Sequence, residues 1–142
     1  MAWEFQYAVD CPVSRAFAWQ FWSNVENWLS DPSVESLTID GPFAAGTRGA
    51  TKTRGGETIN WHLIEVEDDH RAVIEIGLPG AVVRFHWQFE DVADAATRLT
   101  QRVTLEGERA ADYLAGTAEL EKGIPAGMQR LAAEIASAAQ KE

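Results

Sequence analysis

The chain has 142 residues and a formal net charge of −10 at pH 7. This length is typical of one domain, residues 1–142, and it is large enough to bury a core without metals or disulfides. The acidic balance disfavours nucleic acid and anionic membranes, because both are bound through clusters of Lys and Arg. We therefore expect neither of them as a partner.

Cysteine usage and hydropathy indicate a cytoplasmic protein. The single cysteine, Cys11, cannot form a disulfide within the chain. No secretory leader pattern follows Met1, and no apolar run reaches the roughly 20 residues that a membrane span needs. The sequence does not choose between a monomer and a homodimer.

The N-terminal part predicts one strand and two short helices. Residues Trp3–Val9 alternate between apolar and polar side chains, which is typical of a half-buried strand. Ser14 is a favourable N-cap for a helix that carries apolar residues at four-residue spacing. A second helical turn is expected over Asn24–Leu29, before Pro32.

Further strands follow, separated by turn residues. Gly55-Gly56 predicts a hairpin turn, and Glu67-Asp68-Asp69 and Leu78-Pro79-Gly80 predict the next two. The expected strands are Val34–Asp40, Thr47–Arg54, Thr58–Val66, Arg71–Gly77, Val82–Glu90 and Ala96–Gly107.

The last two strands predict a sheet with one apolar face and one polar face. Side chains alternate across a strand, so Phe85, Trp87 and Phe89 share one face while Arg84 and His86 share the other. The last strand behaves in the same way. Its expected inward residues are Leu99, Gln101, Val103 and Leu105.

A C-terminal helix is expected to cover the apolar face. Ile124, Met128 and Leu131 fall on one helical stripe. Pro125 fits best in a first turn, so the main helix is expected over Ile124–Gln140, with a looser approach over Ala110–Glu121. Gly127 leaves space beneath the helix.

Four segments carry a family resemblance: Asn24–Trp28 and the runs GPFAAGTRG, INWHLIEVE and TRLTQRVTLEG. They resemble the START-like, or SRPBCC, superfamily, which includes the polyketide cyclase/dehydrase-like proteins. The resemblance implies an α+β helix-grip fold, with two short helices after the first strand and a seven-stranded antiparallel sheet curled around a long C-terminal helix. It also implies a cavity between sheet and helix. Members bind lipids, sterols, hormones or polyketides, and some act as cyclases or aromatases.

The inward positions predict an enclosed cavity of a few hundred Å³ with apolar walls and few polar groups. Each tryptophan, taken alone, is also consistent with simple core packing. Gln101 lies among apolar residues, so its amide bonds either a ligand or a neighbouring backbone group. The candidate ligand-binding residues are Tyr7, Thr51, Trp61, Leu63, Phe85, Trp87, Gln101, Tyr113, Ile124, Met128 and Leu131.

No motif predicts a metal, a cofactor or a catalytic constellation. His62 and His86 fall on the outer face, and His70 lies in an acidic turn, so none has metal-ligand spacing. Acid–base chemistry would have to use Tyr7, Tyr113, or Glu75 in an alternative register. The acidic residues around Glu67-Asp68-Asp69 are expected to be a solvated strand end.

Three functional hypotheses remain. The first is binding or transport of a small hydrophobic molecule, which is lipid-, polyketide- or aromatic-like. The second is a polyketide cyclase/dehydratase-like enzyme, which convergence of Tyr7, Tyr113 and Gln101 on one cavity would favour. The third is a protein-interaction module of the chaperone-activator type, which predicts a filled interior and an exposed apolar patch.

Overall fold

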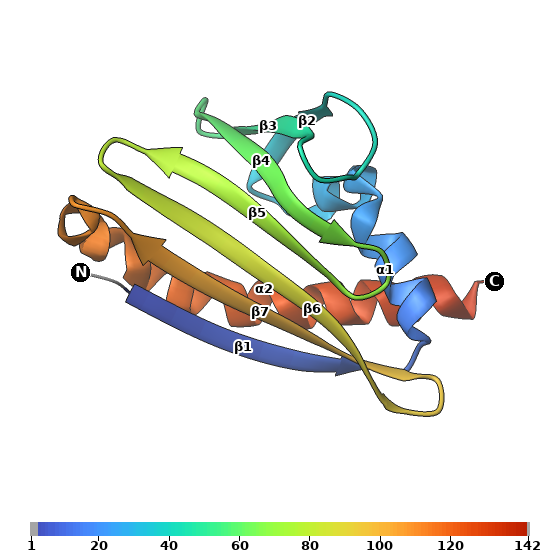
Figure 1. Cartoon of the computed structure of the whole chain (residues 1–142). Coiled ribbons are helices and arrows are strands. Elements are labelled where there is room, and N and C mark those ends of the chain that lie inside the picture. The colour runs from blue at the N-terminus through green and yellow to red at the C-terminus, as the bar shows by residue number, and fades with distance from the viewer. Residues whose placement is uncertain (1–2, 142) are drawn as a thin grey trace.

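The computed structural model describes residues 3–141 and has the predicted helix-grip architecture (Figure 1). The strands form one antiparallel, seven-stranded sheet in the order β1-β7-β6-β5-β4-β3-β2. The strands are β1 (Trp3–Cys11), β2 (Val34–Ile39), β3 (Arg48–Thr53), β4 (Thr58–Glu67), β5 (Arg71–Leu78), β6 (Ala81–Ala93) and β7 (Ala96–Glu106). The helices are α1 (Arg15–Ser23), the 3-10 helices η1 (Val25–Ser30) and η2 (Ala110–Tyr113), and α2 (Leu114–Gln140).

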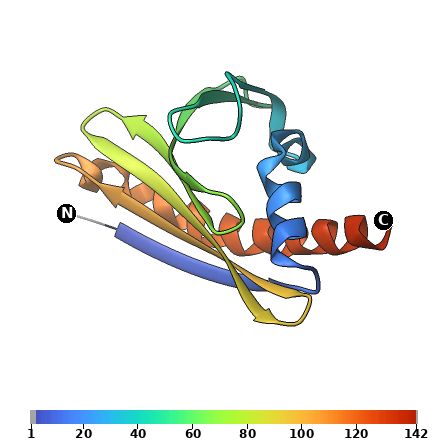
Figure 2. The ribbon, with the colours of Figure 1, turned by 45° about the vertical axis from the view of Figure 1, so that its right-hand side comes forward.

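The helix α1 begins directly after Ser14, its predicted N-cap, and η1 begins directly after Asn24. The Ser14 hydroxyl accepts a hydrogen bond from the Phe17 amide at 3.1 Å, and the Asn24 side chain accepts one from the Glu26 amide at 3.2 Å. Each bond satisfies an amide that has no partner within its helix. Because β1 and β2 are opposite edges of the sheet, α1 and η1 carry the chain from one edge to the other (Figure 2).

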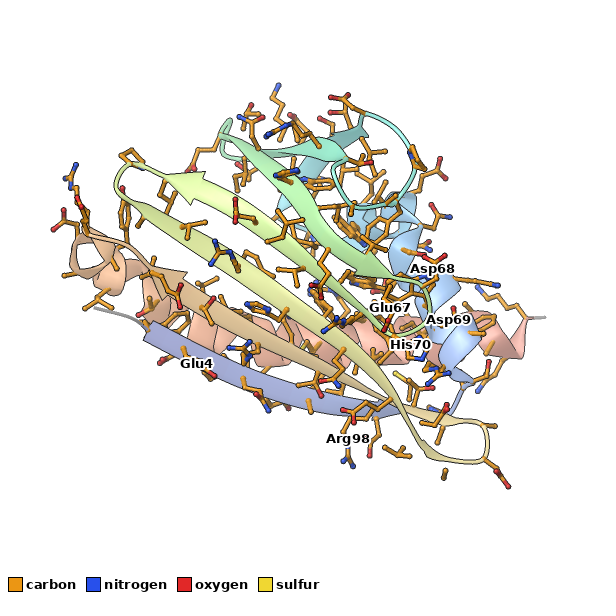
Figure 3. The ribbon with its side chains drawn as sticks, in the orientation of Figure 1. Glu4, Glu67, Asp68, Asp69, His70 and Arg98 are labelled. Carbon is orange, nitrogen blue, oxygen red and sulfur yellow. The ribbon has the colours of Figure 1, made fainter. Side chains whose placement is uncertain are left out.

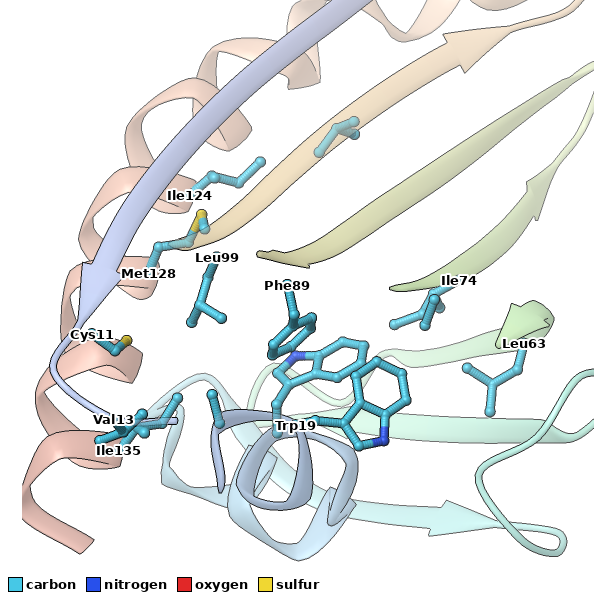
Figure 4. Close-up of a cluster of buried hydrophobic side chains, with 14 of the residues drawn as sticks. Cys11, Val13, Trp19, Leu63, Ile74, Phe89, Leu99, Ile124, Met128 and Ile135 are labelled. Carbon is cyan, nitrogen blue, oxygen red and sulfur yellow. The ribbon is translucent and has the colours of Figure 1, made fainter. Parts of the chain in front are cut away.

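The core lies between the concave face of the sheet and the helices. Under α1, the rings of Trp19 and Phe89 pack edge to face with their centroids 5.2 Å apart. Figure 4 shows these rings together with Leu63 and Leu99 from the sheet and Ile135 from α2. The side chains of Leu63, Leu99 and Ile135 are completely buried, so this end of the molecule is solidly packed.

The outer face of the sheet is polar and is crossed by ion pairs. Arg84 on β6 contacts Glu75 on β5 at 2.9 Å, and Arg98 on β7 contacts Asp10 on β1 at 2.9 Å. Figure 3 shows Arg98 on this side of the ribbon and the acidic residues gathered at the turn between β4 and β5. The prediction of which side chains face outward on these four strands is therefore confirmed.

The C-terminal helix is longer than the sequence predicts. It begins at Leu114, ten residues before the expected start, and Pro125 lies inside it. Proline removes one backbone hydrogen bond from a helix interior. The expectation was wrong because it considered Pro125 alone, whereas the buried neighbours Ile124 and Met128 hold the helix against the sheet on both sides of it. No helix within residues 3–141 is long and apolar enough to cross a membrane.

Gly49 provides a test of the packing beneath β3. A Cβ atom at Gly49 would overlap the six-membered ring of Trp61. We expect Gly49→Ala to lower the free energy of unfolding in urea by about 1–3 kcal/mol, because overpacking displaces the indole. Gly77→Ala is the matched control, since a Cβ there meets no atom within 4 Å. Equal stability of the two variants would contradict this account of Gly49.

Candidate functional site

A cavity of about 470 Å³ lies between the concave face of the sheet and α2. Its floor comes from β3 to β7, including Thr51, Ile74 and Phe85, and its other side comes from Ile124 and Met128 of α2. Its volume agrees with the predicted few hundred Å³. The prediction of an enclosed cavity was wrong, because exposed residues of η1 and α2 belong to its lining and form a mouth.

A row of indole rings forms one wall of the cavity. The centroids of Trp61 and Trp28 are 5.3 Å apart, those of Trp28 and Trp22 are 5.8 Å apart, and those of Trp22 and Trp87 are 4.9 Å apart. The Trp28 indole N–H donates to the Trp22 carbonyl, and the Trp61 indole N–H donates to the Thr51 hydroxyl. These bonds fix the orientation of both rings. Trp28 and Trp87, the partly exposed rings of this row, can therefore offer a rigid aromatic surface to a flat molecule.

Gln101 is the buried polar residue of the cavity wall. It is only 7% exposed, and its amide forms no hydrogen bond with any other residue between 3 and 141. Within that range, every fully inaccessible side-chain nitrogen or oxygen atom has a partner. The Gln101 amide must therefore reach open space, and the space beside it is the cavity. A buried amide without a protein partner is suited to bonding a ligand or a water molecule.

The mouth of the cavity lies between two parts of the chain. One side is formed by η1 and the start of β2, and the other side by the middle of α2. The Ser30 hydroxyl donates to a Glu134 carboxylate oxygen at 3.1 Å, and Arg130 lies 3.7 Å from Asp31. Gly123 of α2 also lines the cavity, and a Cβ atom there would meet nothing within 4 Å. The helix therefore leaves a gap at this position instead of closing the mouth.

The structure brings most of the predicted residues together and places three elsewhere. Leu63 is packed in the core beside Ile74, outside the cavity lining. Tyr7 accepts a hydrogen bond from Gln129 at 2.7 Å, and Tyr113 donates one to the Pro79 carbonyl at 2.7 Å. Tyr7 lies opposite Gln101 in the β1–β7 pair, but neither tyrosine lines the cavity, so the three residues do not converge on it. The predicted residues that line it are Thr51, Trp61, Phe85, Trp87, Gln101, Ile124, Met128 and Leu131.

Sequence reasoning missed the contribution of the short helices to the site. Trp22 from α1 and Trp28 from η1 line the cavity, as does Asn27. Trp28 belongs to the Asn24–Trp28 segment that carries the family resemblance, so that segment was a usable signal. The charged residues of the mouth, such as Glu134, gave no such signal, because solvated helix faces have the same composition.

Titratable residues of the outer face are mostly paired or isolated in the part of the chain that the structure describes. No group of three or more His, Cys, Asp or Glu between residues 3 and 141 could hold a metal ion. Burial, together with the neighbouring Arg102 and Arg84, lowers the pKa of His86. A hollow of about 550 Å³ over β2 to β5 includes His62 and Glu75, but Glu75 is already paired with Arg84.

Solved structures of similar fold cover the whole chain. Norcoclaurine synthase from Thalictrum flavum, in complex with dopamine and hydroxybenzaldehyde, has a TM-score of 0.77 and 13% identity over 100% of this chain and 88% of its own. Ara h 8.0201 has a TM-score of 0.72 and 16% identity over 100% of both chains. The di-domain ARO/CYC StfQ of the steffimycin pathway has a TM-score of 0.72 and 16% identity over 100% of this chain and 53% of its own. No curated protein matches the sequence.

The sheet gripping α2 and the cavity between them define a protein of the START-like, helix-grip class. Within this class, the model of the polyketide cyclase/dehydrase and lipid transport family matches residues 2–136. The chain therefore belongs to that family. At identities of 13–16%, the solved structures support the fold alone.

Cys11 is the chain's one thiol, and its position makes it unreactive. It is 1% exposed, and burial and the neighbouring Asp10 raise its pKa to about 11. At pH 8 only about one molecule in a thousand would carry the thiolate, the nucleophilic form. We expect iodoacetamide, followed by mass spectrometry, to label the native protein far more slowly than the urea-unfolded protein. Equal labelling rates would contradict this placement of Cys11.

Proposed function

We propose that this protein binds or carries a small hydrophobic molecule, aromatic- or polyketide-like, in the cavity between sheet and α2. The observation that carries the proposal is an open cavity whose aromatic wall stands beside the buried amide of Gln101, which has no protein partner within residues 3–141. Apolar walls with a few placed polar groups are typical of small-molecule sites. Membership of a family of cyclases, dehydrases and lipid transport proteins agrees with this function.

The two alternative functions have less support. An enzyme that works by acid–base catalysis would need an acid or base beside the substrate. The ionisable residues lining the cavity lie at its mouth, whereas Tyr7 and Tyr113 are engaged elsewhere. A protein-interaction module would have a filled interior and an apolar surface patch. The large hydrophobic residues exposed within residues 3–141 are Leu29 and Val92, which lie on separate elements.

Binding can be tested by blocking the mouth. Gly123 lines the cavity and has room for a side chain, so Gly123→Leu should place an isobutyl group in the opening. Gly116→Leu is the matched control, since Gly116 lies on the same helix, also has room, and does not line the cavity. We expect an apolar fluorescent dye to bind the native protein and the control with one-to-one stoichiometry. Gly123→Leu should lower its affinity at least about tenfold.

Native mass spectrometry of the purified protein complements this titration by detecting a co-purified small molecule. If no dye binds and no molecule co-purifies, the proposed function is wrong. If the dye binds the native protein and both variants equally, it binds outside this cavity, which also contradicts the proposal.

Gln101 tests whether the cavity recognises a polar group. Gln101→Leu keeps most of the volume and removes the donor and the acceptor. For a ligand with a carbonyl or hydroxyl at its inner end, we expect the affinity to fall by about 1–3 kcal/mol, because the ligand group loses its partner. The thermal midpoint should stay equal or rise, since the protein loses no internal hydrogen bond.

The control for this substitution is Gln88→Leu, because Gln88 is exposed on the outer phase of β6 and should leave the affinity unchanged. A destabilised Gln101→Leu protein with unchanged affinity would show that the glutamine has a structural role instead.

A further inference from the structure

The charge at the mouth points to a particular ligand class. Resting on the proposed function, we infer that the cavity selects a planar aromatic molecule with a neutral polar group at its inner end and a positively charged group at its outer end. Molecules with a negatively charged outer end, such as fatty-acid anions or aromatic carboxylates, are disfavoured. The inference joins three features of one cavity: its aromatic wall, its buried amide and its acidic mouth.

Carboxylates predominate at the mouth. Asp31, Glu119 and Glu134 line it, and Arg130 is the cationic residue in the lining. Arg130 offsets one of these three charges and lies between two of the carboxylates, 3.7 Å from Asp31 and 4.0 Å from Glu134, so the lining keeps a formal charge of −2. An incoming anion would have to break these contacts to reach the guanidinium. Glu119 forms no salt bridge within residues 3–141, so it is free to meet a cation.

The electrostatic potential from the rest of the chain is negative, like that of the carboxylates at the mouth. The whole chain carries a formal charge of −10, so it adds to the local negative potential instead of opposing it. A cleft with low-dielectric walls concentrates such a field and raises the local concentration of the opposite charge. This attraction weakens with ionic strength, because the mouth is solvent-exposed. The selectivity should therefore be strongest at low salt.

The interior favours a flat molecule without charge at its inner end. The ring of Trp28 is partly exposed and is held by its N–H bond to the Trp22 carbonyl, so it gives the cavity a preformed aromatic surface. An amide such as Gln101 can bond a neutral carbonyl or hydroxyl, but it cannot neutralise a buried ion. A charge on the ligand is therefore best placed at the mouth, where carboxylates and water both reach it.

A series of three anthracene probes can test the inference. The probes are anthracen-2-ylmethylammonium, anthracen-2-ylmethanol and anthracene-2-carboxylate, which share one ring system and differ in charge. Their affinities are measured by titration calorimetry at pH 7 in low and in high salt. We expect the ammonium to bind most tightly and the carboxylate most weakly, with about a tenfold difference between them at low salt.

Substitution of a mouth carboxylate then tests the origin of this order. Glu119→Gln keeps the shape and removes one negative charge, so the ratio of ammonium to carboxylate affinity should fall about threefold. The matched control is Glu108→Gln, which makes the same charge change at an exposed residue outside the cavity lining and should leave the ratio nearly unchanged. The alcohol should bind equally well to the native protein and to both variants.

The possible results separate this inference from the proposed function. Equal affinities for the three probes, or tightest binding of the carboxylate, would overturn the charge selectivity while leaving ligand binding intact. An equal change of the ratio in both variants would also overturn it, because the total charge would then be responsible and not the mouth. If none of the probes binds and the apolar dye also fails, the proposed function is overturned as well.

Discussion

The structure depends on the contact between the apolar stripe of α2 and the concave face of the sheet. Ile124, Met128 and Ile135 are the buried residues of this helix (Figure 4), and each contributes about 1.5–3 kcal/mol by leaving water. Their burial explains why the helix continues through Pro125. Gly123 and Gly127 also line the cavity but carry no side chain to fill it. The contact that holds the sheet to the helix therefore leaves a cavity beside it.

The segment between the two edge strands completes this cavity. Because β1 and β2 lie at opposite edges, α1 and η1 must cross the open end of the curled sheet. They bring Trp22 and Trp28 into line with Trp61 and Trp87 of the sheet. Beneath α1, Trp19 and Phe89 fill the remaining space. One end of the interior is thus solid core and the other is an open site.

Polar groups are distributed unevenly between the outer face of the sheet and the interior. The outer face of the sheet is occupied by cross-strand ion pairs such as Arg84–Glu75, which keep charged groups in water. The interior is apolar apart from a few groups, and most of these have partners, as Trp61 does in Thr51. Gln101 differs from them, because its amide faces the cavity and not another residue within the described chain. That difference is why we assign it a role in ligand recognition.

The sequence by itself determined the sheet, its two faces and the family. Period-two alternation placed Phe85, Trp87 and Gln101 on the inner face correctly, because strand geometry alone decides which side chains share a face. It could not determine the start of α2, since the cost of Pro125 is offset by packing against distant strands. Nor could it separate Leu63, a core residue, from its inward-facing neighbour Trp61, which lines the cavity. Only the tertiary structure decided which inward-facing residues of the sheet are covered by α1 and which line the cavity. The reason is that this division depends on where α1 crosses the sheet.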